Sequence, residues 1–135
     1  MLLDGIISLL TANTTVNGLV RGRVYMSLLP RGYRLPAIAL HRYGGTQDYE
    51  FDGPVGVRED QVQIDVYGDT VEDCQTTIEA VRSTLVGYVG TLPDGTVVQA
   101  CYLEREMDMP YLPHADQKAV ANRTLLGFRF VTTRV

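Results

Sequence analysis

The stretch from Val57 to Leu85 constrains the fold most, because two hydrophobic periodicities meet in it at a Gly-Asp-Thr break. Before the break, Val62, Ile64 and Val66 alternate with Gln, Asp and Tyr residues, a pattern typical of a strand with one buried face. After it, residues spaced by three and four form one stripe along an α-helix, namely Val71, Cys74, Ile78, Val81 and Leu85. The stretch therefore predicts a strand and a helix packed as two layers, with Thr70 at the helix start.

Alternating apolar residues predict three further strands, at residues 37–43, 96–106 and 119–131. Residues 2–10 predict a first helix, followed by at most one more helical turn at residues 16–20 and a short extended piece at residues 22–25. The expected class is therefore α+β: an antiparallel sheet of about four strands with helices packed on one face, in the order α-β-β-α-β-β.

Prolines, glycines and polar residues predict loops at residues 28–36 and 107–117. A third loop is expected at residues 44–60, with Gly44-Gly45 and Gly53-Pro54 interpreted as turns. A loop of this length is unusual unless it is functional or contains a small hairpin of its own. At its centre, acids alternate with aromatic residues in the run Asp48, Tyr49, Glu50, Phe51 and Asp52.

The chain of 135 residues is expected to form a single domain over residues 1–135. Its net charge of −4 and pI near 5.0 argue against a dedicated nucleic-acid binder. Cys74 and Cys101 are expected to be reduced structural thiols. The N-terminal residues lack the basic leader of a signal peptide, and no apolar run approaches the roughly 20 residues that span a bilayer. We therefore expect no membrane association and a cytosol-like compartment.

The sequence offers little for catalysis. His41 and His114 have no metal-ligand spacing, no serine lies in a nucleophile elbow, and no glycine-rich stretch continues as a phosphate-binding loop. We expect no metal and no cofactor. Two sets of alternating acids remain, namely Asp48, Glu50 and Asp52, and Glu104, Glu106 and Asp108. Each set forms either a solvated surface, a surface that repels an anion, or a surface that docks a basic partner.

Several segments, in this order and spacing, resemble the tail-completion proteins of long-tailed bacteriophages, which are similar in role to the tail terminators of lambda-like phages. They are LLDGIISLL, RVYMSLLPRGYRLPAIALHRYGG, the run YEFDGPVGVREDQVQIDVYGDT continuing into a helix, and LLGFRFVTTRV. The resemblance covers nearly the full chain and carries no catalytic motif.

The resemblance implies a virion structural protein, not an enzyme. Such proteins form a ring, commonly of six copies, on the head-proximal end of the tail tube; they end tube growth and offer the surface to which the head connector binds. The implied partners are further copies of this chain, the tail tube protein and the connector or neck protein. Genomic DNA would pass through without sequence-specific binding. Assembly would take place in the host cytoplasm.

In this interpretation the acidic and aromatic run at residues 48–52 forms an arm that reaches a neighbouring subunit or the inner wall of the ring. On the inner wall its three acids would repel passing DNA. Tyr111, with Tyr49 and Phe51, is a candidate contact residue, because exposed aromatic residues often anchor interfaces.

Two alternatives stay open at this point. A neck or head-closure protein would share the ring symmetry but contact the portal side. A homodimeric α+β binding module, or a small enzyme that uses Glu50 and His41, would require a concave pocket with perturbed carboxylates.

Overall fold

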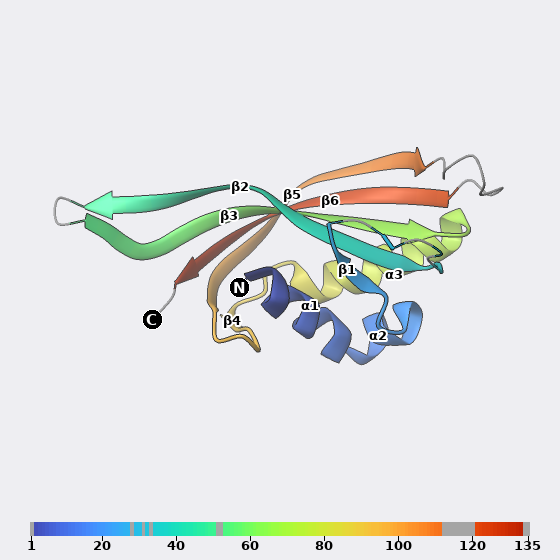
Figure 1. Cartoon of the computed structure of the whole chain (residues 1–135), viewed down its shortest axis with the longest axis horizontal. Coiled ribbons are helices and arrows are strands. Elements are labelled where there is room, and N and C mark those ends of the chain that lie inside the picture. The colour runs from blue at the N-terminus through green and yellow to red at the C-terminus, as the bar shows by residue number, and fades with distance from the viewer. Residues whose placement is uncertain are drawn as a thin grey trace.

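The computed structural model describes residues 2–27, 29–30, 32, 34–50, 53–111 and 121–133, without the side chains of residues 46–50, 53–56, 109–111 and 121. Its elements, in chain order, are α1 (Leu2–Ala12), α2 (Thr14–Val20), β1 (Val24–Met26), β2 (Ala37–Glu50), β3 (Gly53–Gly68), α3 (Val71–Leu85), β4 (Gly90–Thr91), β5 (Val97–Tyr111) and β6 (Ala121–Thr133). The helices pack together against one face of a single sheet (Figure 1), so the predicted α+β layering is confirmed.

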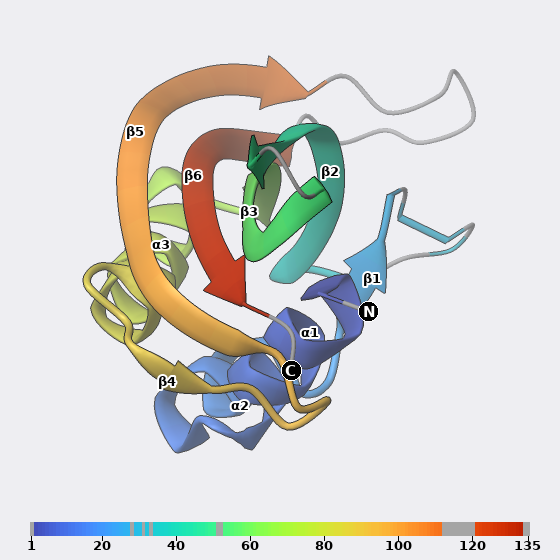
Figure 2. The ribbon, with the colours of Figure 1, turned by 90° about the vertical axis from the view of Figure 1, so that its left-hand side faces the viewer.

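The sheet has six strands in the order β1-β2-β3-β6-β5-β4 among the described residues, where the sequence predicted about four. The two additional strands are three and two residues long, too short to show a period of two. β1 pairs in parallel with β2, while the other neighbours are antiparallel, so the sheet is mixed and not wholly antiparallel. Register shifts in β5 mark bulges that bend the strand, and Figure 2 shows β5 curving around β6.

The central strand and helix form as predicted. Val62, Ile64 and Val66 are fully buried, and they face the helices together with the alternate residues of β6. The side chain of Thr70 caps α3 by accepting a hydrogen bond from the Asp73 amide at 3.0 Å. Val71 is the exception in the helical stripe, because it remains 64% exposed at the first position of α3.

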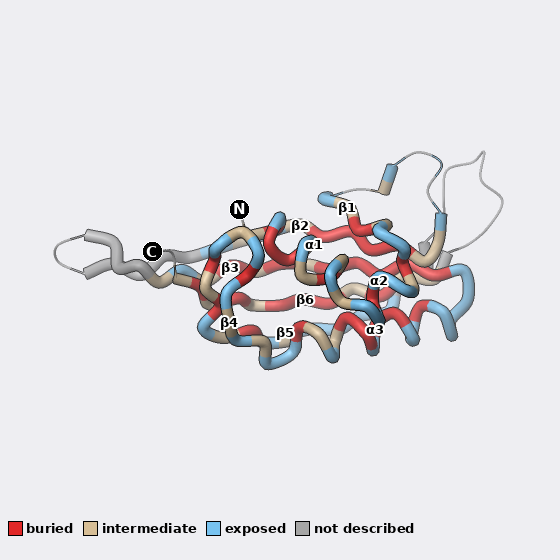
Figure 3. The backbone as a smooth tube through the Cα atoms, turned by 90° about the horizontal axis from the view of Figure 1, so that it is seen from below, coloured by how far each residue is buried: buried red, intermediate tan, exposed pale blue. Residues whose placement is uncertain are grey.

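The core lies between the sheet and the three helices, as the buried segments in Figure 3 show. Its largest fully buried side chains are Phe128, Phe130, Ile6, Leu10, Ile38, Leu40, Ile64, Ile78, Leu85, Leu92, Leu126 and Val16. Burying each side chain of this size stabilises the fold by roughly 1.5–3 kcal/mol. The helix layer is thus held by hydrophobic burial on one face of the sheet.

The second helix is longer than the single turn that the sequence predicted. It covers seven residues because Asn13 acts as its N-cap, accepting hydrogen bonds from the amides of Thr15 and Val16 at 3.0 and 3.1 Å. Val16 and Val20 are fully buried, so this helix contributes to the core. The polar and small residues before it had suggested only a break in the chain.

The described part of residues 44–60 forms paired strands and not a loop, which is the alternative of a hairpin within this segment that the sequence left open. β2 continues to Glu50 and β3 begins at Gly53, and the two pair along their length. Gly44 and Gly45 lie within β2 beside a register shift, so they mark a bulge and not a turn. Pro54 is tolerated in β3 because β6 pairs with β3 only from Val57 onward, which leaves Pro54 on an edge.

The loop predicted at residues 107–117 is partly wrong. β5 continues to Tyr111, and Pro110 within it pairs with Asn122 of β6 on one side only. Residues 112–120 lie outside the described residues. The last strand begins at Ala121 and ends at Thr133, two residues later at each end than predicted.

Candidate interaction surfaces

Residues 44–50 of β2 and 53–60 of β3 form what we call the arm. Figure 1 shows these two strands continuing past the helices at one end of the molecule. The acidic and aromatic run predicted as a contact site therefore lies at the end of a hairpin: Asp48, Tyr49 and Glu50 are the last residues of β2. Phe51 and Asp52 lie outside the described residues.

An ion cluster holds the base of the arm. The Asp60 carboxylate accepts hydrogen bonds from Arg42 Nη1 and Arg58 Nε, each at 3.0 Å, and Asp60 is only 4% exposed. A Cβ atom at Gly45 would lie 2.5 Å from Asp60 Oδ1 and 2.6 Å from Arg42 Nη1, so only glycine leaves room for this pair. The glycine of the bulge and the ion cluster thus form one structural unit.

Two long edges of the sheet carry no strand partner within the described residues. β1 pairs with β2 only at residues 38–40, which leaves the rest of β2 open toward the arm. On the opposite side, β4 pairs with β5 only at Val97 and Val98. Tyr111, a predicted contact residue, is the last residue of this second edge, and its side chain is not described.

The acids predicted as a second acidic surface are largely engaged within the chain. Glu106 forms an ion pair with Arg82 of α3, and Asp108 accepts a hydrogen bond from Thr124 at 2.7 Å. Glu104 lies 3.9 Å from Arg129. These carboxylates belong to the fold's own polar contacts, which weakens the prediction that they dock a partner.

The sheet face away from the helices carries three arginines stacked on aromatic rings. Their guanidinium carbons lie 5.0–5.5 Å from the ring centroids in the pairs Arg105–Tyr43, Arg123–Tyr67 and Arg129–Tyr102. Arg123 also forms an ion pair with Asp65 at 2.9 Å, and Asp65 is 3% exposed. Near Asp65, β3 is therefore buried on both faces, whereas the sequence predicted one buried face. These pairs join different strands, so only the strand register could have revealed them.

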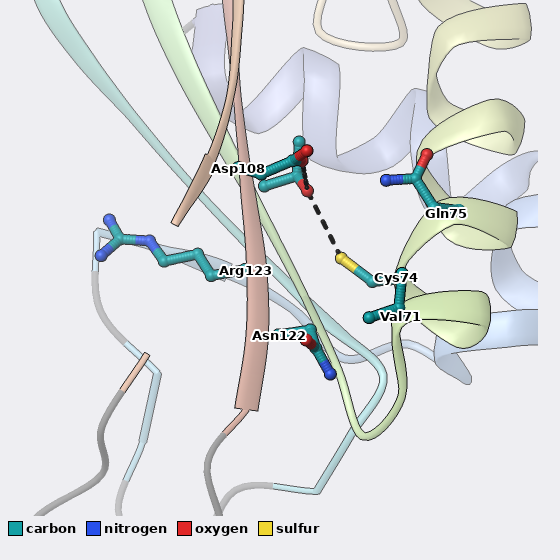
Figure 4. Close-up of a pocket in the computed structure, with 7 residues that line it drawn as sticks. Val71, Cys74, Gln75, Asp108, Asn122 and Arg123 are labelled. Atoms are coloured by element: carbon teal, nitrogen blue, oxygen red, sulfur yellow. Dashed lines mark hydrogen bonds between the residues drawn. The ribbon is translucent and has the colours of Figure 1, made fainter. Parts of the chain in front are cut away.

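A small cavity of about 150 Å³ lies between the start of α3, the last part of β5 and the start of β6 (Figure 4). Its one nucleophile is Cys74, whose thiol lies 3.5 Å from the Val66 carbonyl oxygen and 3.6 Å from Thr124 Oγ1. Burial raises the pKa of the Cys74 thiol, which keeps it protonated and unreactive near neutral pH. Burial also raises the pKa of Cys101 to about 12. Both cysteines are free and buried, so neither supplies a thiolate for catalysis.

The geometry also separates the two residues of the enzymatic alternative. His41 and Glu50 are nine residues apart on one strand, so at about 3.3 Å per residue they lie roughly 30 Å apart. The described residues contain no group of three or more His, Cys, Asp or Glu side chains that could hold a metal ion.

No helix within the described residues is long and apolar enough to cross a membrane.

Comparison with known proteins gives the chain its family. Residues 4–132 match the family described as "Tail completion protein gp17". Curated protein sequences give no match. A chain in a structure described as "Virion of native gene transfer agent (GTA) particle" shares the fold, with a TM-score of 0.77 and 20% identity over 98% of this chain and 95% of that chain. The chain belongs to the tail completion protein gp17 family, and it is a structural, non-enzymatic phage tail protein.

Proposed function

We propose that this protein forms a ring of six copies that closes the head-proximal end of the tail tube. The ring would end tube polymerisation and present the surface that joins the tail to the head. The observation that carries the proposal is the pair of long open strand edges on the two sides of one sheet, in a chain whose family match covers residues 4–132.

Open edges of this length favour association, because their free amide and carbonyl groups can pair with another chain. The two edges differ: one belongs to β2 and the arm, the other to β5, where four of residues 104–108 are charged. A contact between two different surfaces is heterologous, and such contacts close into rings when the rotation between copies allows it. Charged residues on the β5 edge would keep the free chain from pairing indiscriminately before it meets the tube.

The partners in this proposal are further copies of the chain, the tail tube protein and the connector or neck protein. DNA would pass through the ring without sequence-specific contacts. The net charge of −4 supports that part of the proposal, because an acidic chain does not retain a polyanion.

The test measures the mass of the purified protein by light scattering over a range of concentrations, with electron microscopy of the largest species. Purified tail tube protein is then polymerised with and without it. We expect rings, free or on tube ends, and tubes that stop lengthening at substoichiometric amounts of this protein. Tubes that lengthen at an unchanged rate would contradict the proposal. Rings that bind isolated connectors but never tubes would favour a neck protein.

A further inference from the structure

A groove runs along α2 and α3, from Asp73 to Thr84 of the longer helix. It consists of two adjoining hollows of about 410 and 500 Å³ that share Gly18, Leu19 and Thr76. A Cβ atom at Gly18 would meet no atom within 4 Å, so the floor of the groove is open at this position. The groove is large enough for several side chains of an extended peptide.

One end of the groove is lined by Arg21, Arg23 and Arg34, together with a single acid, Asp73. The Arg23 Nε donates a hydrogen bond to the Pro36 carbonyl oxygen at 3.0 Å, which fixes this side chain at the rim. Leu19, Leu35 and Pro36 supply apolar surface between the charges. The site therefore combines guanidinium groups with an apolar floor.

These three arginines differ from the others that the structure describes. Each of the other six contacts a carboxylate or an aromatic ring: Arg42, Arg58, Arg82, Arg105, Arg123 and Arg129. Arg21, Arg23 and Arg34 form no ion pair or ring contact among the described residues. Among the described residues, the arginines without an ion pair or a ring contact thus line one groove. Guanidinium groups bind carboxylates in bidentate geometry, so an acidic segment is the matching ligand.

The end of the arm has the complementary chemistry. In sequence, Asp48, Glu50 and Asp52 alternate with Tyr49 and Phe51, which supplies three carboxylates for the three arginines and two rings for the apolar floor. Figure 1 places the arm and α2 at opposite ends of the molecule. The arm therefore cannot fill the groove of its own chain, but it can reach that of another copy.

We propose that the acidic end of the arm docks into the arginine groove of the neighbouring copy in the ring. This inference rests on the proposed function and deepens it, because it adds to the pairing of strand edges a specific side-chain contact between successive subunits. Glu50 follows Arg42 by eight positions along β2, which at about 3.3 Å per residue gives the arm a reach of roughly 26 Å. The apolar floor suits an acidic, aromatic peptide better than the phosphates of DNA, because it can receive the aromatic rings.

The first experiment measures binding without assembly. A fluorescent peptide with the sequence of residues 46–54 is titrated with the full chain, beside a control peptide in which Asn and Gln replace the three acids. We expect the acidic peptide to bind at least tenfold more tightly, with affinity falling as salt is added. The double variant Arg21→Glu/Arg34→Glu should lose this preference, and Arg105→Glu, a charge reversal outside the groove, should keep it. Equal binding of both peptides would overturn the docking contact.

The second experiment measures assembly by charge exchange. Arg21→Glu/Arg34→Glu and Asp48→Arg/Glu50→Arg should each abolish rings, while the chain with all four substitutions should form them again. The fourfold variant has the wild-type composition of charges, so net charge cannot explain a rescue. Circular dichroism and the unfolding midpoint establish that each variant is folded. Folded double variants that still form rings would overturn the contact. An arm variant that forms normal rings and impairs only DNA passage would overturn it as well.

The two proposals can fail separately. If the wild type ends tube growth and both double variants do so equally well, the docking contact is wrong and the terminator function stands. If the acidic peptide binds the groove but the wild type never stops tube growth, the groove stands and the terminator function is wrong.

Discussion

The two halves of the β2–β3 hairpin use the same strand pairing in different surroundings. In the inner half, Ile38 and Leu40 lie opposite Val66 and Ile64, and all four are fully buried under the helices. In the outer half, the arm continues the ladder to the pair of Glu50 with Gly53 without a helix to cover it. One half is held by hydrophobic burial, whereas the other has its backbone ladder, the pairing of residues 57–60 with β6 and the ion cluster at Asp60.

This difference separates stability from assembly. An isolated two-stranded hairpin is marginally stable in water, so the arm keeps its shape because it continues a buried sheet. Its side chains are then free to be selected for contact with other proteins. We therefore expect substitutions in the inner half to unfold the chain, and substitutions at the end of the arm to disrupt assembly while leaving the fold intact.

The largest loss of stability is expected for Phe128→Ala. Phe128 is fully buried on the helix-covered face, with its ring centroid 6.1 Å from that of Phe130. Removing the ring leaves a cavity and should lower the free energy of unfolding by about 3–5 kcal/mol, measured by urea denaturation. The matched control Phe128→Leu should lower the free energy of unfolding by less, because leucine fills part of the space of the ring. A loss below about 1 kcal/mol for the alanine variant would show that this face is not tightly packed.

A smaller loss is expected at the base of the arm. Asp60→Asn removes the charge that pairs with Arg42 and Arg58, whose side chains are 45% exposed and can be rehydrated. Because of that exposure we expect a cost of about 1–2 kcal/mol rather than the larger cost of a fully buried pair. Relative to the wild type, the variant should show faster amide hydrogen exchange, and the increase should be larger in the arm than in the inner half. Unchanged exchange in the arm would mean that the cluster does not stabilise it.

The cap of α3 comes next. Thr70→Ala removes the hydrogen bond from the Asp73 amide to the Thr70 side chain, and should lower the free energy of unfolding by about 1 kcal/mol. Thr76→Ala is the control, because the exposed Thr76 hydroxyl donates only to the Glu72 carbonyl within the helix. Urea denaturation of both variants should separate them. Equal stability of the two would contradict a capping role for Thr70.

The smallest effect on stability is expected at the end of the arm. Asp48→Asn/Glu50→Gln should change the free energy of unfolding by no more than about 0.5 kcal/mol, as is usual for surface positions. The same variant should show weakened ring formation by light scattering. A large loss of stability would remove the distinction between the two halves of the hairpin.

The inner half could be predicted from the sequence because burial imposes a period on it. Val62, Ile64 and Val66 alternate as a strand must, and the helix that follows begins at a recognisable cap. Val71 fits the helical spacing but remains exposed, because periodicity gives the angle around a helix and not how far the covering layer extends.

The arm could not be predicted in the same way. Gly44, Gly45 and Pro54 are typical of turns, yet here they serve a bulge, a close ion pair and an unpaired strand edge. The acidic and aromatic run was identified as a candidate contact from sequence, but the groove that matches it was not. Arg21, Arg23 and Arg34 lie within 14 residues of one another, and only the packing of α2 on α3 shows that they line one groove, where none forms an ion pair with another described residue.

Trimming the arm tests the separation of stability and assembly most directly. A two-residue Asn-Gly turn joins Gln47 to Arg58, which pair across the hairpin, in place of residues 48–57. Urea denaturation and tube polymerisation are then measured on the same preparation. We expect the trimmed chain to unfold cooperatively with nearly wild-type stability, yet fail to form rings or stop tube growth. A trimmed chain that stops tube growth as well as the wild type, or one that no longer folds, would contradict the account.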